Sequence, residues 1–222
     1  MKTEKIPLCD RCDMLTDEQM DILVSNSELR QYKKGQYIYE EGNVDDYIYI
    51  LKSGSVKIAR STNEGREVIK NVIHHDMIFG ECVVTGCKER QNYAKALDND
   101  VAVYALKLDA LKAVMAENFD FCLFVMAEIR TKLTFAEKRM ESLVVNDARS
   151  RIVDFIKYNA AKAGKAIGFE TLVKHSLTQQ DIANYTGTSR QTVTSVFNDL
   201  KKDNQIYFKR KSILIRDMKS LA

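Results

Sequence analysis

Short apolar segments alternate with turn signals over the first half of the chain. Between residues 33 and 108, runs of three to six residues rich in Ile, Val and Tyr are separated by Gly, Asn or Asp. Short strands with tight turns at regular spacing are typical of small antiparallel barrels and jelly rolls. We therefore expect residues 1–115 to form an antiparallel β jelly-roll barrel, and no helical period fits residues 33–108. The runs that we assign to strands are residues 37–39, 47–51, 56–58, 68–73 and 101–106.

The period changes after Asp109. From residue 122 the apolar positions recur in steps of four and three, which keeps them on one face only if the helix is continuous. A narrow stripe of this kind favours pairing with another helix, so we predict a long dimerisation helix over residues 116–145. The alternative is an amphipathic helix that packs on its own barrel without a second chain. The predicted dimer contacts are Cys122, Met126, Ile129, Leu133, Ala136, Met140 and Leu143.

A second domain is expected to cover residues 146–222. Asn146 and Asp147 interrupt the apolar stripe, and one of them would cap a new helix over residues 148–163. Gly164 would close that helix. The break between the two helices is therefore the predicted domain boundary.

Residues 178 to 202 carry the pattern of a helix-turn-helix. Thr178 would cap a first helix, and Ala183 is small where two helices would cross closely. Gly187 lies four residues later, in a turn that needs positive φ or close approach. Ser189 would cap the second helix, whose buried face then carries two aliphatic residues, Val193 and Val196. The alternative is a pair of ordinary core helices.

If the second helix enters the major groove, the exposed side chains at its start meet the bases. Arg190 suits the O6/N7 edge of guanine, and Gln191 suits adenine. Hydroxyl side chains at a helix N-terminus suit phosphate, and a basic turn between strands predicted at 206–208 and 213–215 suits the DNA backbone as a wing. The predicted DNA contacts are Thr178, Ser189, Arg190, Gln191, Thr192, Thr194, Ser195, Lys209, Arg210 and Lys211.

Charge is distributed unevenly along the 222 residues. The formal net charge is +3, to which residues 148–222 contribute +8 and residues 1–147 contribute −5. A basic segment joined to a slightly acidic body favours a polyanionic partner such as double-stranded DNA. A basic surface that is only solvated has the same composition and is the alternative.

The overall composition is that of a globular protein, with 45% hydrophobic and 29% charged residues. No apolar run approaches the roughly 20 residues that cross a bilayer, and the first residues do not read as a secretory signal. Five cysteines are too few for a disulfide scaffold in a chain of this length. We expect a cytoplasmic protein without a membrane partner.

A barrel, a long helix and a winged helix-turn-helix, in this order, resemble the CRP/FNR family of bacterial transcription regulators. The best local matches are YIYILKSGSVKIARSTNEGREVI at residues 47–69, IFGE at 78–81 and DIANYTGTSRQTVTSVFNDLKK at 181–202. The last match is the most specific, because the recognition helix of the family typically begins Ser-Arg-(Glu/Gln)-Thr-Val. The resemblance covers nearly the whole chain and implies an α+β fold with two domains. It also implies a homodimer that binds a pseudo-palindromic operator, recruits or blocks RNA polymerase, and rotates its DNA-binding domains about a hinge near residues 146–147.

The resemblance further implies a cyclic-nucleotide-binding-like effector pocket at Gly80, Glu81, Arg90 and Gln91. Arg90 could bind an anion with two parallel hydrogen bonds. Cyclic-AMP binders of the family carry a Gly-Glu pair followed by Arg-Ser-Ala, whereas here Gln and Asn follow the Arg, at a spacing one residue shorter. Residues 135–137 also offer no hydroxyl pair for the adenine. We predict an unidentified effector other than cyclic AMP; a cyclic nucleotide and a purely structural Glu81–Arg90 ion pair are the alternatives.

The cysteines offer other ways to sense a signal. Cys9 and Cys12 resemble part of the iron–sulfur branch of the family, which uses three clustered N-terminal cysteines and one later in the chain. Two thiols are too few for a cluster or a closed zinc site, although a dimer could pool four, and a redox thiol pair is a further alternative. We expect Cys122 to pack as a small apolar residue, and Cys82 and Cys87 to fill or edge the barrel. No metal site is predicted.

Haem is the least supported cofactor, because His74 and His75 lie in a predicted turn. The sequence contains no Gly-rich phosphate loop, nucleophile elbow or His–carboxylate metal pattern, so no enzymatic activity is predicted. The leading interpretation is a sequence-specific transcription regulator. The alternatives are a cyclic-nucleotide-responsive module that acts through protein contacts, and a redox- or metal-sensing regulator that uses Cys9 and Cys12.

Overall fold

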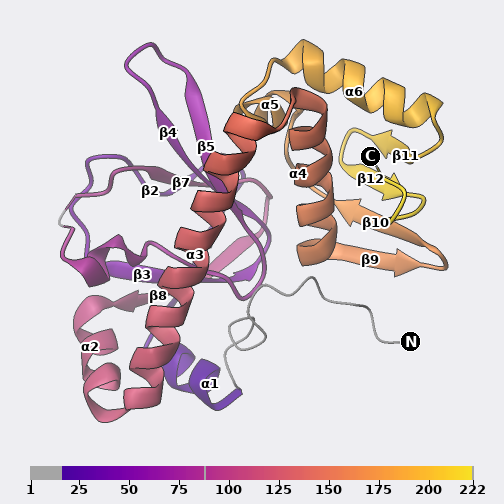
Figure 1. The fold of residues 1–222 in the computed structure, drawn as a ribbon. Helices are drawn as coiled ribbons and strands as arrows, with labels where there is room; N and C mark the ends of the chain where they lie inside the picture. Colours follow the sequence, from indigo (N-terminus) through magenta and orange to yellow (C-terminus); the bar gives the residue numbers. More distant parts are fainter. Residues whose placement is uncertain (1–16, 88, 222) are drawn as a thin grey trace. The chain divides into compact units, whose positions relative to one another are not determined.

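The computed structural model describes residues 17–87 and 89–221 (Figure 1). Cys9 and Cys12 lie outside the described residues. The chain divides into two compact units: residues 1–60 with 72–138, and residues 61–71 with 139–222. The second unit thus begins within the long helix, before the boundary predicted at residue 146, and includes the tip of one β-hairpin.

The first unit contains two antiparallel β-sheets, as the turn-punctuated pattern predicted. Their strand orders are β1-β8-β3-β6 and β2-β7-β4-β5. All five predicted strands are present, and β1, β6, β7 and a short 3₁₀ helix (η1) are additional. The elements are α1 (Asp17–Ser25), β1 (Glu28–Tyr32), β2 (Tyr37–Tyr39), β3 (Tyr47–Ser53), β4 (Val56–Ser61), β5 (Glu67–Ile73), β6 (Ile78–Phe79), η1 (Glu81–Thr85), β7 (Tyr93–Ala96), β8 (Val101–Lys107), α2 (Leu108–Glu117) and α3 (Phe119–Val145).

Strand β3 is buried on both faces, because it separates two cores. Side chains alternate across a strand. Tyr49 and Leu51 belong to the cluster between the sheets, whereas Ile48 and Ile50 belong to a second cluster with Leu111, Phe121 and other residues of the helices. Four consecutive residues of β3 are therefore buried, because a sheet covers one face of the strand and helices cover the other.

Beyond the end of α3 and the tip of the β4–β5 hairpin, the second unit contains three helices and a four-stranded sheet of order β11-β12-β10-β9. Asp147 caps α4, as predicted, by accepting a hydrogen bond from the Ser150 amide at 2.7 Å. Gly164 ends α4 but also opens β9, so the hairpin of β9 and β10 was missed by sequence reasoning. The elements are α4 (Ala148–Ala163), β9 (Gly164–Ile167), β10 (Glu170–Lys174), α5 (Gln179–Thr186), α6 (Arg190–Lys202), β11 (Ile206–Lys209) and β12 (Ser212–Ile215).

No helix within residues 17–87 and 89–221 is long and apolar enough to cross a membrane.

Candidate nucleic-acid interface

Helices α5 and α6 form the predicted helix-turn-helix. The Thr178 hydroxyl accepts from the Asp181 amide at 3.1 Å, and the Asp181 carboxylate accepts from the Thr178 amide at 2.8 Å, which completes a capping box. Gly187 ends α5 with a φ of 65°, a conformation that favours glycine. Ala183 and Val193 are buried, as the sequence pattern predicts for the inner faces of the two helices.

The start of α6 presents an open polar surface. Ser189 caps the helix by accepting from the Thr192 amide at 3.0 Å. The side chains of Arg190, Gln191, Thr194, Ser195 and Asn198 line one open depression. Sequence reasoning missed Asn198, although it lies three residues beyond Ser195 and therefore on the same helix face. We call the surface made by these five residues the α6 polar face.

Arg190 and Gln191 of the α6 polar face carry unused hydrogen-bond donors. Arg190 and Gln191 are exposed, and neither side chain has a hydrogen-bond or ion-pair partner among the residues that the structure describes. Thr194 differs, because its Oγ1 lies 2.8 Å from Gln179 Oε1 and 2.9 Å from the Arg190 carbonyl oxygen. Of the predicted base contacts, Arg190 and Gln191 are ready to donate to a ligand, whereas Thr194 also links α5 to α6.

The hydroxyls predicted to meet phosphate are grouped at helix N-termini. The Ser189 and Thr192 hydroxyl oxygens lie 2.8 Å apart in the first turn of α6, where the helix dipole is positive. The Thr178 hydroxyl, by contrast, donates a hydrogen bond within its own helix, to Asp181 Oδ2 at 2.6 Å. A phosphate at Thr178 would have to share that hydroxyl with a carboxylate.

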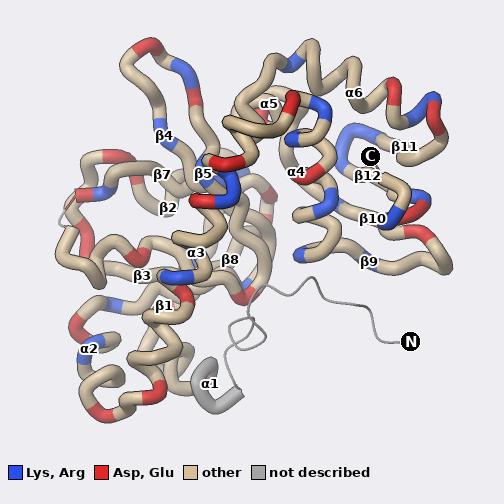
Figure 2. The backbone as a smooth tube through the Cα atoms, in the orientation of Figure 1, with Lys and Arg blue, Asp and Glu red and all other residues tan. Residues whose placement is uncertain are grey.

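The predicted wing is present as strands β11 and β12. Lys209 pairs with Ser212, so Arg210 and Lys211 form the turn between the strands. All three basic side chains are exposed. Figure 2 shows Lys and Arg at this turn and at the start of α6. The second unit thus offers guanidinium and amide donors at the start of α6 and three basic side chains on the wing.

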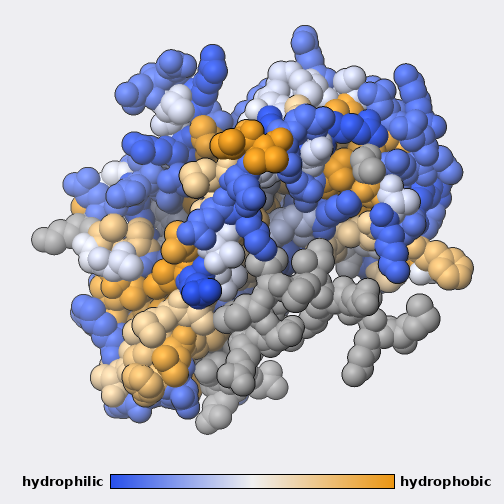
Figure 3. Space-filling model, viewed as in Figure 1, coloured by the Kyte–Doolittle hydropathy of each residue, from blue (hydrophilic) through white to orange (hydrophobic). Residues whose placement is uncertain are grey.

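Most of the predicted dimer stripe on α3 is solvent-exposed in the single chain. Met126 and Leu133 are each 58% exposed, and Met140 is 65% exposed. Figure 3 shows hydrophobic residues along this helix. Such large apolar side chains at heptad spacing are typical of a helix that pairs with another. Ala136 and Leu143 lie on the same exposed face.

Two members of the predicted stripe turn inward instead. Cys122 is half-buried and its thiol donates to the Met115 carbonyl at 3.1 Å, while Ile129 packs against the cluster between sheet and helices. Exposed Leu123 and Val144, which sequence reasoning missed, lie next to the stripe. Spacing alone does not distinguish the inward-facing from the exposed positions, because residues three and four apart lie on the same side of a helix.

Of the predicted effector residues, Arg90 contacts Gly80, whereas Glu81 is paired elsewhere and Gln91 is exposed. Arg90 is 2% exposed and donates to Asp45 and to the carbonyls of Tyr47 and Gly80. Burial alone would lower the pKa of Arg90, but the hydrogen bonds and charge of Asp45 outweigh it, so the pKa is raised above its ordinary value. Arg90 is thus a charged, hydrogen-bonded part of the barrel core, and both terminal nitrogens of its guanidinium are already engaged.

Aromatic rings fill the space beside this guanidinium. The Tyr39 ring lies 4.4 Å from the Arg90 guanidinium carbon, measured to the ring centroid. Tyr49 stacks on Tyr39 and on Phe79, with centroid distances of 5.7 and 5.2 Å. Gly80 is also enclosed, since a Cβ there would lie 3.1 Å from Arg90 Nη1. The barrel interior at the predicted pocket is therefore packed with side chains.

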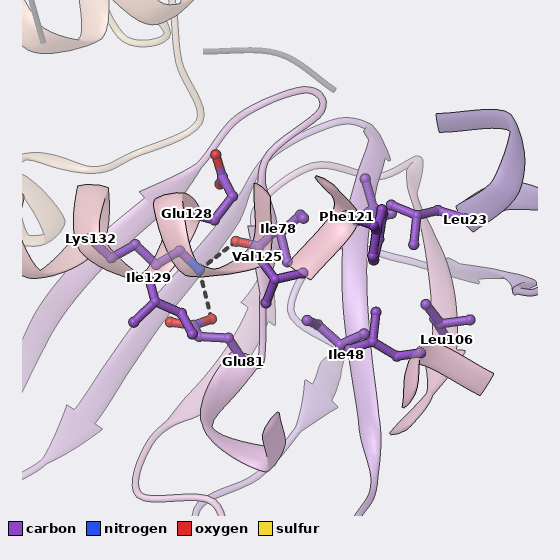
Figure 4. A pocket seen from close by; sticks show the side chains of 12 residues that line it. Leu23, Ile48, Ile78, Glu81, Leu106, Phe121, Val125, Glu128, Ile129 and Lys132 are labelled. Atoms are coloured by element: carbon purple, nitrogen blue, oxygen red, sulfur yellow. Dashed lines mark hydrogen bonds and ion pairs between the residues drawn. The ribbon is translucent and has the colours of Figure 1, made fainter. Parts of the chain in front are cut away.

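Glu81 is paired with the long helix and not with Arg90. Lys132 Nζ donates to Glu81 Oε2 at 2.6 Å and to the Ile78 carbonyl at 2.7 Å (Figure 4). This pair and Glu128 line the polar end of a largely apolar cavity of about 20 Å³, which has room for about one water molecule. The structural ion pair considered between Glu81 and Arg90 is thus replaced by two separate pairs. Gln91 is exposed and joins neither.

Of the remaining sensor candidates, His75 lies in an exposed turn, His74 before it is half-buried, and Cys9 and Cys12 lie outside the described residues. His75 is exposed, and its Nδ1 lies 2.6 Å from the Asp76 carboxylate. Within the described ranges, no three His, Cys, Asp or Glu side chains are arranged to hold a metal ion.

Known proteins match the chain in both units. The family model of the cyclic nucleotide-binding domain matches residues 29–118, and that of the Crp-like helix-turn-helix domain matches residues 150–222. The CRP-like cAMP-activated global transcriptional regulator of Mycobacterium tuberculosis is 28% identical over 191 residues, which are 86% of this chain and 85% of that protein. The global nitrogen regulator of Synechocystis is 23% identical over 192 residues, with coverages of 86% and 85%.

Solved structures agree on the fold. FixK2 from Bradyrhizobium japonicum superposes with a TM-score of 0.79 at 21% identity, over 88% of this chain and 95% of that one. The two domain models match in the order that the barrel and the helix-turn-helix have here, and the relative from Mycobacterium tuberculosis, aligned over most of its length, is a transcriptional regulator. This chain belongs to the CRP/FNR family of DNA-binding transcription regulators.

Proposed function

We propose that the protein is a homodimer that reads a pseudo-palindromic operator in double-stranded DNA, with α6 in the major groove and the wing on the backbone. The observation that carries this proposal is the α6 polar face, where Arg190 and Gln191 keep their donors unused at the start of a capped helix. Arg reads guanine and Gln reads adenine with paired hydrogen bonds. Lys209, Arg210 and Lys211 supply the charge that phosphate contacts need.

Dimerisation rests on the exposed apolar stripe of α3. Met126, Leu133 and Met140 repeat at heptad spacing and are more than half exposed in the single chain. A second copy would cover them in a symmetric seam. We assign residues 1–115 to the effector domain, 116–145 to dimerisation and 146–222 to DNA binding. The protein then acts in the cytoplasm by regulation and without catalysis.

The effector is proposed to be a molecule other than cyclic AMP. The relative from Mycobacterium tuberculosis is named as cAMP-activated, but here Arg90 is committed to Asp45 and the carbonyls beside it. Tyr39 and Tyr49 occupy the adjoining space. A cyclic phosphate would have to displace these contacts, which favours a different ligand.

The test is selection of the purified protein on a randomised double-stranded DNA pool without added ligand. We expect an enriched palindrome whose half-sites are about one helical turn, or roughly 34 Å, apart. Enrichment of a single isolated half-site would contradict the symmetric dimer. A parallel selection with cyclic AMP should give the same enrichment, and enrichment only with cyclic AMP would overturn the effector proposal.

Arg190→Ala should reduce discrimination between operator and mismatched DNA by about 1–3 kcal/mol, because a two-fold hydrogen-bonded contact to guanine is lost. The matched control is Arg210→Ala on the wing, which should weaken binding to all sequences alike. It should also reduce the slope of the logarithm of the binding constant against the logarithm of the salt concentration by about one, the contribution of one phosphate contact. Both variants are measured by equilibrium binding to operator and to scrambled DNA at several salt concentrations. An unchanged specificity ratio in Arg190→Ala would remove that residue from base recognition.

RNA polymerase is the proposed protein partner, and the β9–β10 hairpin is its proposed contact. Phe169 at the tip is fully exposed and Ile167 is 48% exposed. Exposed aromatic anchors of this kind dominate protein interfaces, and their truncation typically costs about 2 kcal/mol or more. Phe169→Ala should leave operator binding unchanged but weaken polymerase binding to the operator-bound protein. Equal polymerase affinity in the variant would exclude the hairpin tip as the contact.

A further inference from the structure

Cys82 and Cys87 are joined by a single backbone turn at the end of η1. The Gly86 amide donates to the Val83 carbonyl at 3.2 Å, and the Cys87 amide donates to the Cys82 carbonyl at 3.1 Å. Gly86 has a φ of 86°. These two bonds around a left-handed glycine define a Schellman motif, in which the residues joined by the outer bond commonly bring their side chains into contact.

The turn also keeps the two residues within the largest Cα separation that a disulfide can span. With an N···O distance of 3.1 Å between the two residues, standard bond lengths hold their Cα atoms within about 7 Å of each other. Disulfides span Cα separations of about 4.4–6.8 Å, and cysteines more than about 7 Å apart cannot be bridged without backbone movement. Both cysteines are free and half-buried.

Cys82 has the surroundings of a reactive thiol. Its Sγ lies 3.3 Å from Arg90 Nη1, which donates a hydrogen bond to it. Reactive cysteines typically lie beside Lys, Arg or His side chains in partly exposed surroundings, and here the Arg90 guanidinium, which is also paired with Asp45, lies beside Cys82. The thiol of Cys122, by contrast, donates to a backbone carbonyl in the helical part of the unit.

We propose that Cys82 and Cys87 are a redox modification site that forms an intramolecular disulfide on exposure to a peroxide. The Cys82 sulfur attacks one peroxide oxygen, the O–O bond breaks, and Cys82 becomes a sulfenic acid while hydrogen peroxide yields one water. The Cys87 sulfur then attacks the Cys82 sulfur, the S–S bond forms, and the sulfenic oxygen leaves as a second water. Two thiols lose two electrons and two protons in total, and the peroxide accepts them.

The sequence allows a direct test on the full-length protein. Trypsin releases residues 71–88 as one peptide that contains Cys82, Cys87 and no other cysteine. After treatment with hydrogen peroxide and alkylation of the remaining thiols, we expect this peptide unalkylated and two hydrogen atoms lighter than its reduced form. Dithiothreitol should restore two alkylatable thiols. Full alkylation of both cysteines after peroxide, or a cross-link from either to another peptide, would overturn the proposal.

Variants assign the two roles. Cys87→Ser should leave a sulfenic acid at Cys82 that dimedone traps, because the resolving thiol is gone. Cys82→Ser should leave Cys87 without dimedone label, and label on Cys87 alone would overturn the assignment. Cys122→Ser is the matched control and should form the disulfide at the wild-type rate. The test does not depend on DNA binding, so its failure is distinguishable from failure of the proposed function.

Discussion

Leu133→Asp should convert the dimer to monomer and abolish tight operator binding. In a symmetric seam Leu133 meets its own copy or the residues beside it, with Met126 and Met140 one heptad away on either side. Two carboxylates would then be removed from water without a partner, at a cost of several kcal/mol. A loss of about 3–5 kcal/mol raises the dimer dissociation constant by roughly two to four orders of magnitude.

Sedimentation equilibrium measures this change directly, and operator binding at the same concentrations measures its consequence. The matched control is Lys138→Asp, which introduces the same side chain at an exposed position of the same helix outside the stripe. It should remain dimeric and bind the operator. A wild-type protein that sediments as a monomer, or a Leu133→Asp variant that sediments as a dimer, would remove α3 as the seam.

Arg90→Leu should destabilise the protein by about 3–5 kcal/mol, because one partner of a buried ion pair is removed. The side chain of Arg90 is 1% exposed and that of Asp45 is 21% exposed, so the carboxylate left behind is poorly hydrated. The carbonyls of Tyr47 and Gly80 lose a donor in the same step. Urea unfolding should show a lower midpoint with an unchanged slope.

Arg60→Leu is the matched control for this experiment. Arg60 pairs with Glu41 at 2.9 Å, but their side chains are 56% and 34% exposed, so the change should cost no more than about 1 kcal/mol. Adding Asp45→Asn to Arg90→Leu should recover part of the lost stability, since the unpaired charge is then gone. If Arg90→Leu unfolds at the same urea concentration as the wild type, Arg90 is not a structural residue of the core, and an effector-binding role is favoured instead.

The helix-turn-helix was predictable because its signals are local. The hydrogen bonds that start α5 and α6 link Thr178 to Asp181 and Ser189 to Thr192, each pair three residues apart. Gly187 ends α5 at a positive φ, which glycine adopts more easily than any other residue. Such features are decided by neighbouring residues, so the chain specifies them before any distant contact forms.

The effector domain was less predictable because its partners are distant in sequence. Arg90 binds Asp45, which lies 45 residues away, and Glu81 binds Lys132, which lies 51 residues away. A motif can show that Gly80, Glu81 and Arg90 are present, but not which carboxylate the guanidinium meets. In the second unit, β10 pairs with β12 about 40 residues later as well as with its neighbour β9.

The sequence by itself determined the order of barrel, long helix and winged helix-turn-helix, and the caps and turn that place Arg190 and Gln191 at the start of α6. Periodicity, caps and turns are properties of residues near each other in the chain. Only the tertiary structure decided that Ile129 turns into the core while Leu133 stays exposed, and that Arg90 is part of the core. A sequence pattern allows several partners for each of these side chains. Packing in the folded protein selects one of them, because the stability that a buried charge or apolar side chain contributes depends on the atoms around it.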